Sequence, residues 1–207
     1  MLPIASVVGI GLVALAMALT PGPNMVYLAS RSIAQGRRAG LVSLGGVALG
    51  FVFYLGASAA GLSALFAAVP AAYTTVKLVG AVYLAYLAWN MLRPGGRSPF
   101  EARELDDHSP FRLFTMGLVT NILNPKIALM YAALVPQFVH PENGPVLGQF
   151  LQLGLVQITV AVAINGAIVL AASSVSEYLR HHPRVMAAQR LVTGALLSAF
   201  AVKVAAT

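Results

Sequence analysis

The sequence predicts an all-α membrane protein, a polytopic bundle of about six transmembrane helices in a single domain over residues 1–207. Composition supports this fold class, because 58% of the residues are hydrophobic and only 9% are charged, whereas a soluble domain carries about 25% charged residues. The apolar runs also reach the roughly 20 residues that a helix needs to cross a bilayer. The net charge of +7 lies in short segments between these runs, so the sequence offers no basic face for nucleic acid.

The predicted spans are apolar runs bounded by charged residues or by proline and glycine clusters. They lie at about 4–30, 40–66, 70–92, 111–138, 146–172 and 186–205. Backbone groups in lipid must be paired within the protein, and no strand-like alternation is present, so these runs are expected to be helices. The polar stretch 93–110 is rich in turn residues and is predicted to be a cytoplasmic loop between two halves, 1–92 and 111–207, of three spans each.

The distribution of basic residues predicts the orientation of the bundle. The second and fourth loops, near 69–70 and 140–145, hold no Lys or Arg, whereas the first, third and fifth loops hold the arginines. Cytoplasmic loops carry such an excess, so we expect both termini outside. No Lys or Arg precedes Arg31, so the first run lacks the basic region of a signal peptide and is expected to remain as a span. The arginines are Arg31, Arg37, Arg38, Arg93, Arg97, Arg103, Arg112, Arg180, Arg184 and Arg190.

Two of the predicted spans are interrupted near the middle of the membrane. Residues 20–24 read T-P-G-P-N, and residues 121–126 read N-I-L-N-P-K. Proline removes a backbone hydrogen bond and clashes with the preceding turn, so both helices should break. Each break then has a capping residue before a proline, which is the order of a new helix start with its positive dipole end and free N–H groups.

The breaks occupy matching places in two halves that run in opposite directions. This pattern predicts an inverted-repeat transporter whose binding site lies where the breaks meet; the alternative is a pair of kinks used only for packing. Asn24 and Tyr27 follow the first break at helical spacing, and Asn121 flanks the second. The candidate substrate-binding residues are therefore Thr20, Pro21, Gly22, Pro23, Asn24, Tyr27, Asn121, Asn124, Pro125 and Lys126.

Lys126 is the cation that this arrangement leaves unexplained. Lys77 and Lys203 fall toward the outer ends of their spans, but Lys126 lies about 21 Å along its helix from Arg112, near the bilayer centre. A charge there costs about 2.5 kcal/mol or more. We expect a bound carboxylate as its partner, and removal of the lysine to stabilise the empty protein; a lysine kept neutral by desolvation is the alternative. The acidic residues all lie in loops or at a span end: Glu101, Glu104, Asp106, Asp107, Glu142 and Glu177.

Other features of the sequence limit the possible functions. There is no Cys, and the histidines lie in loops, so we expect no cofactor, no metal site and no enzyme activity. Gln152, Gln157 and Asn165 lie along the fifth span, where we favour hydrogen bonding between neighbouring helices over a role in binding. The G-x-x-x-G motif at 46–50 indicates a close helix contact, either internal or in a homodimer.

At these residues the chain resembles the LysE/RhtB family of bacterial amino-acid exporters. The matching segments are A-L-T-P-G-P-N at 18–24, G-R-R-A-G at 36–40, the run at 77–89, T-N-I-L-N-P-K-I-A-L at 120–129 and R-L-V-T-G-A-L-L at 190–197. The resemblance implies secondary, proton-exchanging export of amino acids or homoserine-lactone-like compounds across the bacterial cytoplasmic (inner) membrane.

The acid-free spans favour a neutral amino acid as cargo over a basic one, because a cationic side chain would need a counter-charge. They leave Lys126 or the amine of the substrate as the proton carrier. Two alternatives remain: an exporter of another small carboxylate metabolite, and an assembly partner for another membrane protein that transports nothing. An unpaired midplane lysine speaks against the second alternative.

Overall fold

The computed structural model describes residues 2–62, 88–96 and 105–206, together with residues 78, 82, 85 and 86. Most of the predicted third span, 70–92, lies outside the described residues, as do the predicted second loop, Lys77, residues 97–104 and the side chain of Lys203. The described part of the chain is helical and contains no strand, which confirms the predicted all-α class.

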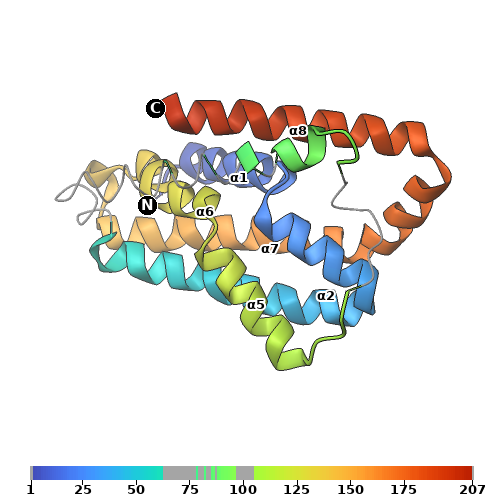
Figure 1. Cartoon of the computed structure of the whole chain (residues 1–207). Coiled ribbons are helices and arrows are strands. Elements are labelled where there is room, and N and C mark those ends of the chain that lie inside the picture. Colours follow the sequence, from blue (N-terminus) through green and yellow to red (C-terminus); the bar gives the residue numbers. More distant parts are fainter. Residues whose placement is uncertain are drawn as a thin grey trace.

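The first two predicted spans correspond to α1 and to a long helix that turns back on itself. Helix α1 covers Ile4–Leu19, and α2 covers Pro23–Ala57. Inside α2, Gly36 has φ 85° and ψ 171°, a left-handed conformation that favours glycine. The helix folds there into two arms, 23–35 and 37–57, so that a Cβ at Gly40 would lie 3.0 Å from Cβ of Ser32. Figure 1 shows the two arms running in opposite directions.

The second half of the chain repeats the broken helix. Helix α5 covers Pro110–Ile122, and α6 covers Pro125–Leu129. The chain continues through a π-helical turn, Met130–Leu134, a 3-10 turn, Val135–Phe138, and a second 3-10 turn, Pro141–Asn143. Two long helices follow, α7 at Val146–His181 and α8 at Pro183–Ala206.

Long apolar helices support a membrane location. Among the described residues, Pro23–Gly61 and Val146–Leu179 are long and apolar enough to cross a membrane, and the pair Pro110–Ile122 and Pro125–Phe138, bent by 49°, makes a third if it counts as one span. Helix α1 is apolar but shorter. The arrangement of six spans in two inverted halves therefore remains a prediction.

Helices α2 and α5 cross at very short range. Gly46 and Gly117 lie at the crossing, where an added Cβ would overlap Phe114 O and Ser43 O respectively. Small residues allow this approach of two backbones. The G-x-x-x-G motif that begins at Gly46 thus makes a helix contact within the chain. The homodimer stays a prediction, and this motif no longer supports it.

The termini and the described loops gather at two opposite ends of the bundle. Figure 1 shows both termini at the same end as the segment 141–145, with the reversal inside α2 and the α7–α8 turn at the opposite end. The charge pattern predicts that these two ends face opposite sides of the membrane, and the side that each end faces remains a prediction.

At the arginine-rich end, the first arm of α2 binds the segment before α5. Arg31, expected in a loop, lies in α2 and is 6% exposed. Its Nη1 donates to Gln35 Oε1 (3.2 Å) and to Asp106 O (3.1 Å), and Gln35 Nε2 donates to His108 O (3.3 Å). Ser32 Oγ donates to Val169 O of α7 (2.6 Å).

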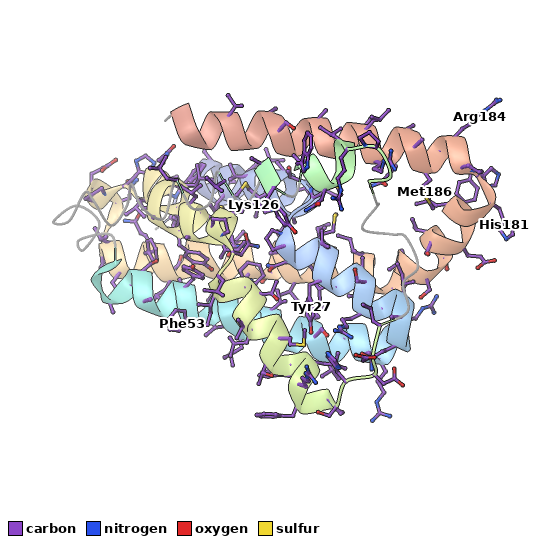
Figure 2. The ribbon with its side chains drawn as sticks, in the orientation of Figure 1. Tyr27, Phe53, Lys126, His181, Arg184 and Met186 are labelled. Atoms are coloured by element: carbon purple, nitrogen blue, oxygen red, sulfur yellow. The ribbon has the colours of Figure 1, made fainter. Side chains whose placement is uncertain are left out.

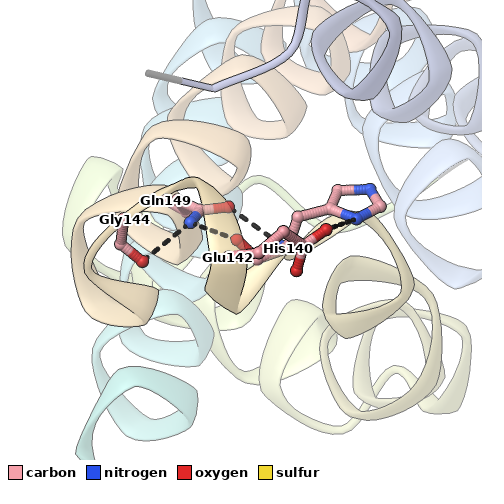
Figure 3. A network of polar contacts seen from close by, with 4 residues as sticks. All are labelled: His140, Glu142, Gly144 and Gln149. Atoms are coloured by element: carbon pink, nitrogen blue, oxygen red, sulfur yellow. Dashed lines mark hydrogen bonds and ion pairs between the residues drawn. The ribbon is translucent and has the colours of Figure 1, made fainter.

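At the opposite end, Gln149 in the first part of α7 braces the preceding loop (Figure 3). Its Nε2 donates to His140 O (2.8 Å) and to Gly144 O (3.0 Å), while its Oε1 accepts from His140 N (3.0 Å). The ring of His140 lies 3.2 Å from Glu142 Oε1. Both ends are therefore fixed by side chains that bind loop backbone.

Candidate functional site

The first helix break lies at the T-P-G-P-N residues, as the sequence predicts. Helix α1 ends at Leu19, and Thr20 is extended, with φ −72° and ψ 121°. Its Oγ1 donates to Ala16 O (2.7 Å), so the hydroxyl binds back to α1 and does not cap the next helix. Gly22 is the N-cap of α2, and Pro23 holds the first helical position, where a missing N–H is harmless.

The second break has a side-chain cap of its own. Helix α5 ends at Ile122, whose carbonyl oxygen accepts from the hydroxyl of Tyr54 (2.6 Å). Asn124 Oδ1 then accepts from Lys126 N (3.1 Å), with Pro125 at the first position of α6. This confirms Asn124 as the N-cap that the sequence predicts.

Lys126 joins the two breaks. Its Nζ donates to Met17 O (2.6 Å) and to Thr20 O (2.7 Å), the free carbonyls at the end of α1. The last carbonyls of a helix lack partners and carry the negative end of its dipole, so a cation is stabilised there. A Cβ on Gly22 would lie 3.2 Å from the same Nζ, so glycine leaves the lysine its place. Figure 2 shows Lys126 midway along the bundle.

This geometry gives the lysine partners that the sequence did not predict, and leaves the expected carboxylate a prediction. The sequence left the lysine without a counter-charge, and a bound carboxylate was expected as its partner. In the structure, two backbone oxygens bind the ammonium. The charge therefore has protein partners before any ligand binds.

A small cavity lies beside the lysine. Its volume is about 20 Å³, close to the roughly 10–15 Å³ that one water molecule needs. Its walls come from α1, α2, α6, the π-helical turn and α7, which brings the first break together with the residues after the second. The lining residues are Ala14, Met17, Ala18, Asn24, Met25, Phe51, Lys126, Ile127, Met130, Gln157, Ala161 and Asn165.

The structure places the predicted site residues differently with respect to the cavity. Asn24 and Lys126 line the cavity, and the Oδ1 of Asn24 is buried without a partner among the described residues. The prolines and Gly22 shape the backbone. Asn121 is fully buried against Gly50, with neither side-chain polar atom bonded in the described part of the chain.

Tyr27 does not line the cavity. Its hydroxyl donates to Leu113 O (2.7 Å) and lies 3.1 Å from Ser43 Oγ, so it joins α2 to α5. The label in Figure 2 places it away from Lys126, toward α5. The role of Tyr27 in substrate binding stays a prediction. The observed hydrogen bonds give it a structural role between α2 and α5.

Two amides of α7 line the cavity, although the sequence pattern favoured a packing role for them. Gln157 and Asn165 are 3% and 5% exposed and both line the cavity. Their spacing of eight residues places them on one helix face, which is the signal that could have singled them out. In the described ranges, no group of His, Asp or Glu side chains could hold a metal ion.

Comparison with known proteins gives a consistent result. The sequence profile described as LysE type translocator matches residues 15–207. An uncharacterized membrane protein of Pseudomonas aeruginosa is 30% identical over 90% of this chain and 88% of its own. The homoserine/homoserine lactone efflux protein of Salmonella typhimurium is 29% identical, over 87% of this chain and 86% of its own. No solved structure matches the chain.

Proposed function

This chain belongs to the LysE type translocator family, and on that premise we propose that it is a secondary transporter. It exports neutral amino acids or close derivatives from the cytoplasm in exchange for protons. It does so as a multi-pass protein of the bacterial cytoplasmic membrane, with both termini outside. The observation that carries the proposal is the meeting of two broken helices at Lys126, beside a cavity lined by amides.

The lining chemistry favours neutral cargo over basic cargo. Its polar members are Lys126 and three amides, Asn24, Gln157 and Asn165, and no Asp or Glu is among the described lining residues. An ammonium and amide groups suit a carboxylate or another carbonyl oxygen. A second cation from an arginine or lysine side chain would meet a like charge with no acid to offset it.

Cargo binding requires the two breaks to separate, because a cavity of about 20 Å³ is too small for an amino acid. A cargo carboxylate would compete with Met17 O and Thr20 O for the ammonium of Lys126. This exchange would release the end of α1 and couple cargo binding to its movement. Lys126 or the amine of the cargo carries the exchanged proton, since no other described lining residue has an ionisable side chain.

The name of the Salmonella relative supports this cargo class, because it specifies an amino acid and its lactone. A lactone has no free carboxylate, so its carbonyl oxygen would take that place. Export of another small carboxylate metabolite is the second candidate, and the ammonium at the cavity favours it equally. A membrane assembly partner without transport activity is the third.

Uptake into inside-out vesicles distinguishes these candidates, because export then appears as accumulation driven by an acidic lumen. Vesicles containing the chain should accumulate threonine or homoserine above control vesicles, and arginine no better than the controls. Accumulation of arginine alone would reverse the cargo class. Accumulation of benzoate alone would indicate a carboxylate exporter, and no accumulation of any compound would favour the assembly role.

The orientation has a separate test, since the chain has no cysteine of its own. Glu142→Cys and His181→Cys sit at opposite ends of the bundle, with side chains 68% and 64% exposed. A membrane-impermeant maleimide added to intact spheroplasts should label the first variant and spare the second. The opposite pattern would place the termini in the cytoplasm.

A further inference from the structure

Two amides on one face of α7 approach the cavity with their orientations already fixed. Gln157 and Asn165 are each more than nine-tenths buried. Asn165 Nδ2 donates to Ala161 O (2.8 Å), which leaves its Oδ1 as an acceptor. Gln157 Oε1 accepts the hydroxyl proton of Tyr131 (2.6 Å), which leaves its Nε2 as a donor. Neither remaining atom bonds to another described residue.

Tyr131 determines which way the Gln157 amide points. It lies in the π-helical turn after the second break, is fully buried, and stacks on Tyr54 with ring centroids 5.8 Å apart. A buried hydroxyl needs an acceptor for its proton, and an amide offers one only on its oxygen. If the Gln157 amide flipped, its N–H would face the hydroxyl and leave the tyrosine proton without a partner.

We propose that Tyr131 is a positioning residue that holds Gln157 as a hydrogen-bond donor to an acceptor oxygen of the cargo. The inference rests on the proposed function, because the cargo occupies the cavity that Lys126 and Gln157 share. Through Tyr131, the π-helical turn after the second break thus contributes to the choice of cargo. Gln157 selects cargo through its N–H, and Tyr131 acts only through Gln157.

If the bond between Tyr131 and Gln157 only stabilised the fold, changes in uptake would follow changes in stability. Gln157→Met keeps the size of the side chain but removes the donor, and it also leaves the tyrosine hydroxyl unpaired. Tyr131→Phe with Gln157→Met removes both members of the bond, which is often nearly neutral for stability. Stability and cargo recognition can therefore be separated in one series.

The experiment measures uptake of threonine or homoserine into inside-out vesicles, together with thermal unfolding in detergent. Gln157→Met should raise the half-saturation concentration about three- to tenfold, the effect of one lost hydrogen bond, and lower the melting temperature. The double variant should recover the melting temperature while keeping the raised half-saturation concentration. Tyr131→Phe should raise that concentration in the parent but not further in the Gln157→Met background.

Gln152→Met is the matched control, because Gln152 lies on the same helix but is exposed; it should behave as the parent. A parent-like half-saturation concentration in Gln157→Met, or its recovery in the double variant, would overturn this inference alone. Failure of the parent vesicles to accumulate any amino acid would overturn the proposed function and this inference with it.

Discussion

The two helix breaks share a backbone design but differ in how their polar groups are paired. At the second break, Asn124 caps the new helix and Tyr54 binds the last carbonyl of the old one. At the first break, the cap is Gly22, which has no side chain, and the hydroxyl of Thr20 binds back within α1. The free carbonyls of α1 are instead bound by Lys126, which belongs to the second break.

This difference indicates that a residue of the second break supplies the hydrogen-bond donor that the first break lacks. Each break has a proline and a new helix start, but only the second break has a lysine. Its ammonium connects segments 109 and 106 residues apart in the chain. The ammonium of Lys126 can leave the two carbonyls to bind a charged ligand. The neutral side chain of Asn124, which caps its own helix, cannot be drawn away in this manner.

The largest expected effect tests the bond between the breaks. Lys126→Met keeps an unbranched side chain, one atom shorter, but leaves Met17 O and Thr20 O without their donor, so the empty protein should lose about 2 kcal/mol or more of stability. Reasoning from the sequence alone gives the opposite sign, because a costly buried charge disappears. Thermal unfolding in detergent decides between them, with Lys203→Met as control, and a higher melting temperature for Lys126→Met would show that the carbonyls contribute little.

A smaller effect tests the cap that the second break supplies for itself. Asn124→Ala should cost about 1 kcal/mol, the usual value of an N-cap. Asn124→Ser should cost less, since serine also accepts from the backbone. The two melting temperatures should therefore rank serine above alanine, and equal values would mean that the bond from Lys126 N adds nothing.

The smallest effect tests the fit of the two breaks. In Gly22→Ala, the new Cβ would lie 3.2 Å from Nζ and 3.4 Å from Cε of Lys126, so the ammonium must shift and its bonds lengthen. We expect a loss below about 1 kcal/mol. Gly11→Ala in α1 is the control, because nothing lies within 4 Å of its added Cβ. If both variants melt alike, Gly22 is not required by the lysine.

The sequence predicted those parts of the fold and site that depend on local chemistry. Proline after a capping residue locates both breaks, and the cap at Asn124 is confirmed. The partners of Lys126 were missed because they are backbone oxygens, which leave no mark on residue identity. The first loop was expected to begin at Arg31, but α2 stays helical through that residue and the chain reverses at Gly36.

The cavity shows a second limit. Its apolar lining consists of alanines, methionines, one isoleucine and one phenylalanine, residue types that occur in any membrane helix. Gln157 was assigned to packing because an amide can bind a neighbouring helix, as it does through Tyr131. Only the geometry reveals that Tyr131 binds the amide oxygen and that the amide nitrogen has no partner among the described residues.

The central claim is that Lys126 serves both the closed connection and the cargo. Its most direct test compares amino-acid uptake by inside-out vesicles carrying the parent, Lys126→Gln and Lys203→Gln at equal protein levels. We predict that Lys203→Gln transports as the parent does and that Lys126→Gln, although inserted and folded, accumulates less than about a tenth as much, as expected when a charge-assisted bond is lost. Parent-level accumulation by Lys126→Gln would contradict the account and leave the lysine a purely structural link between the two breaks.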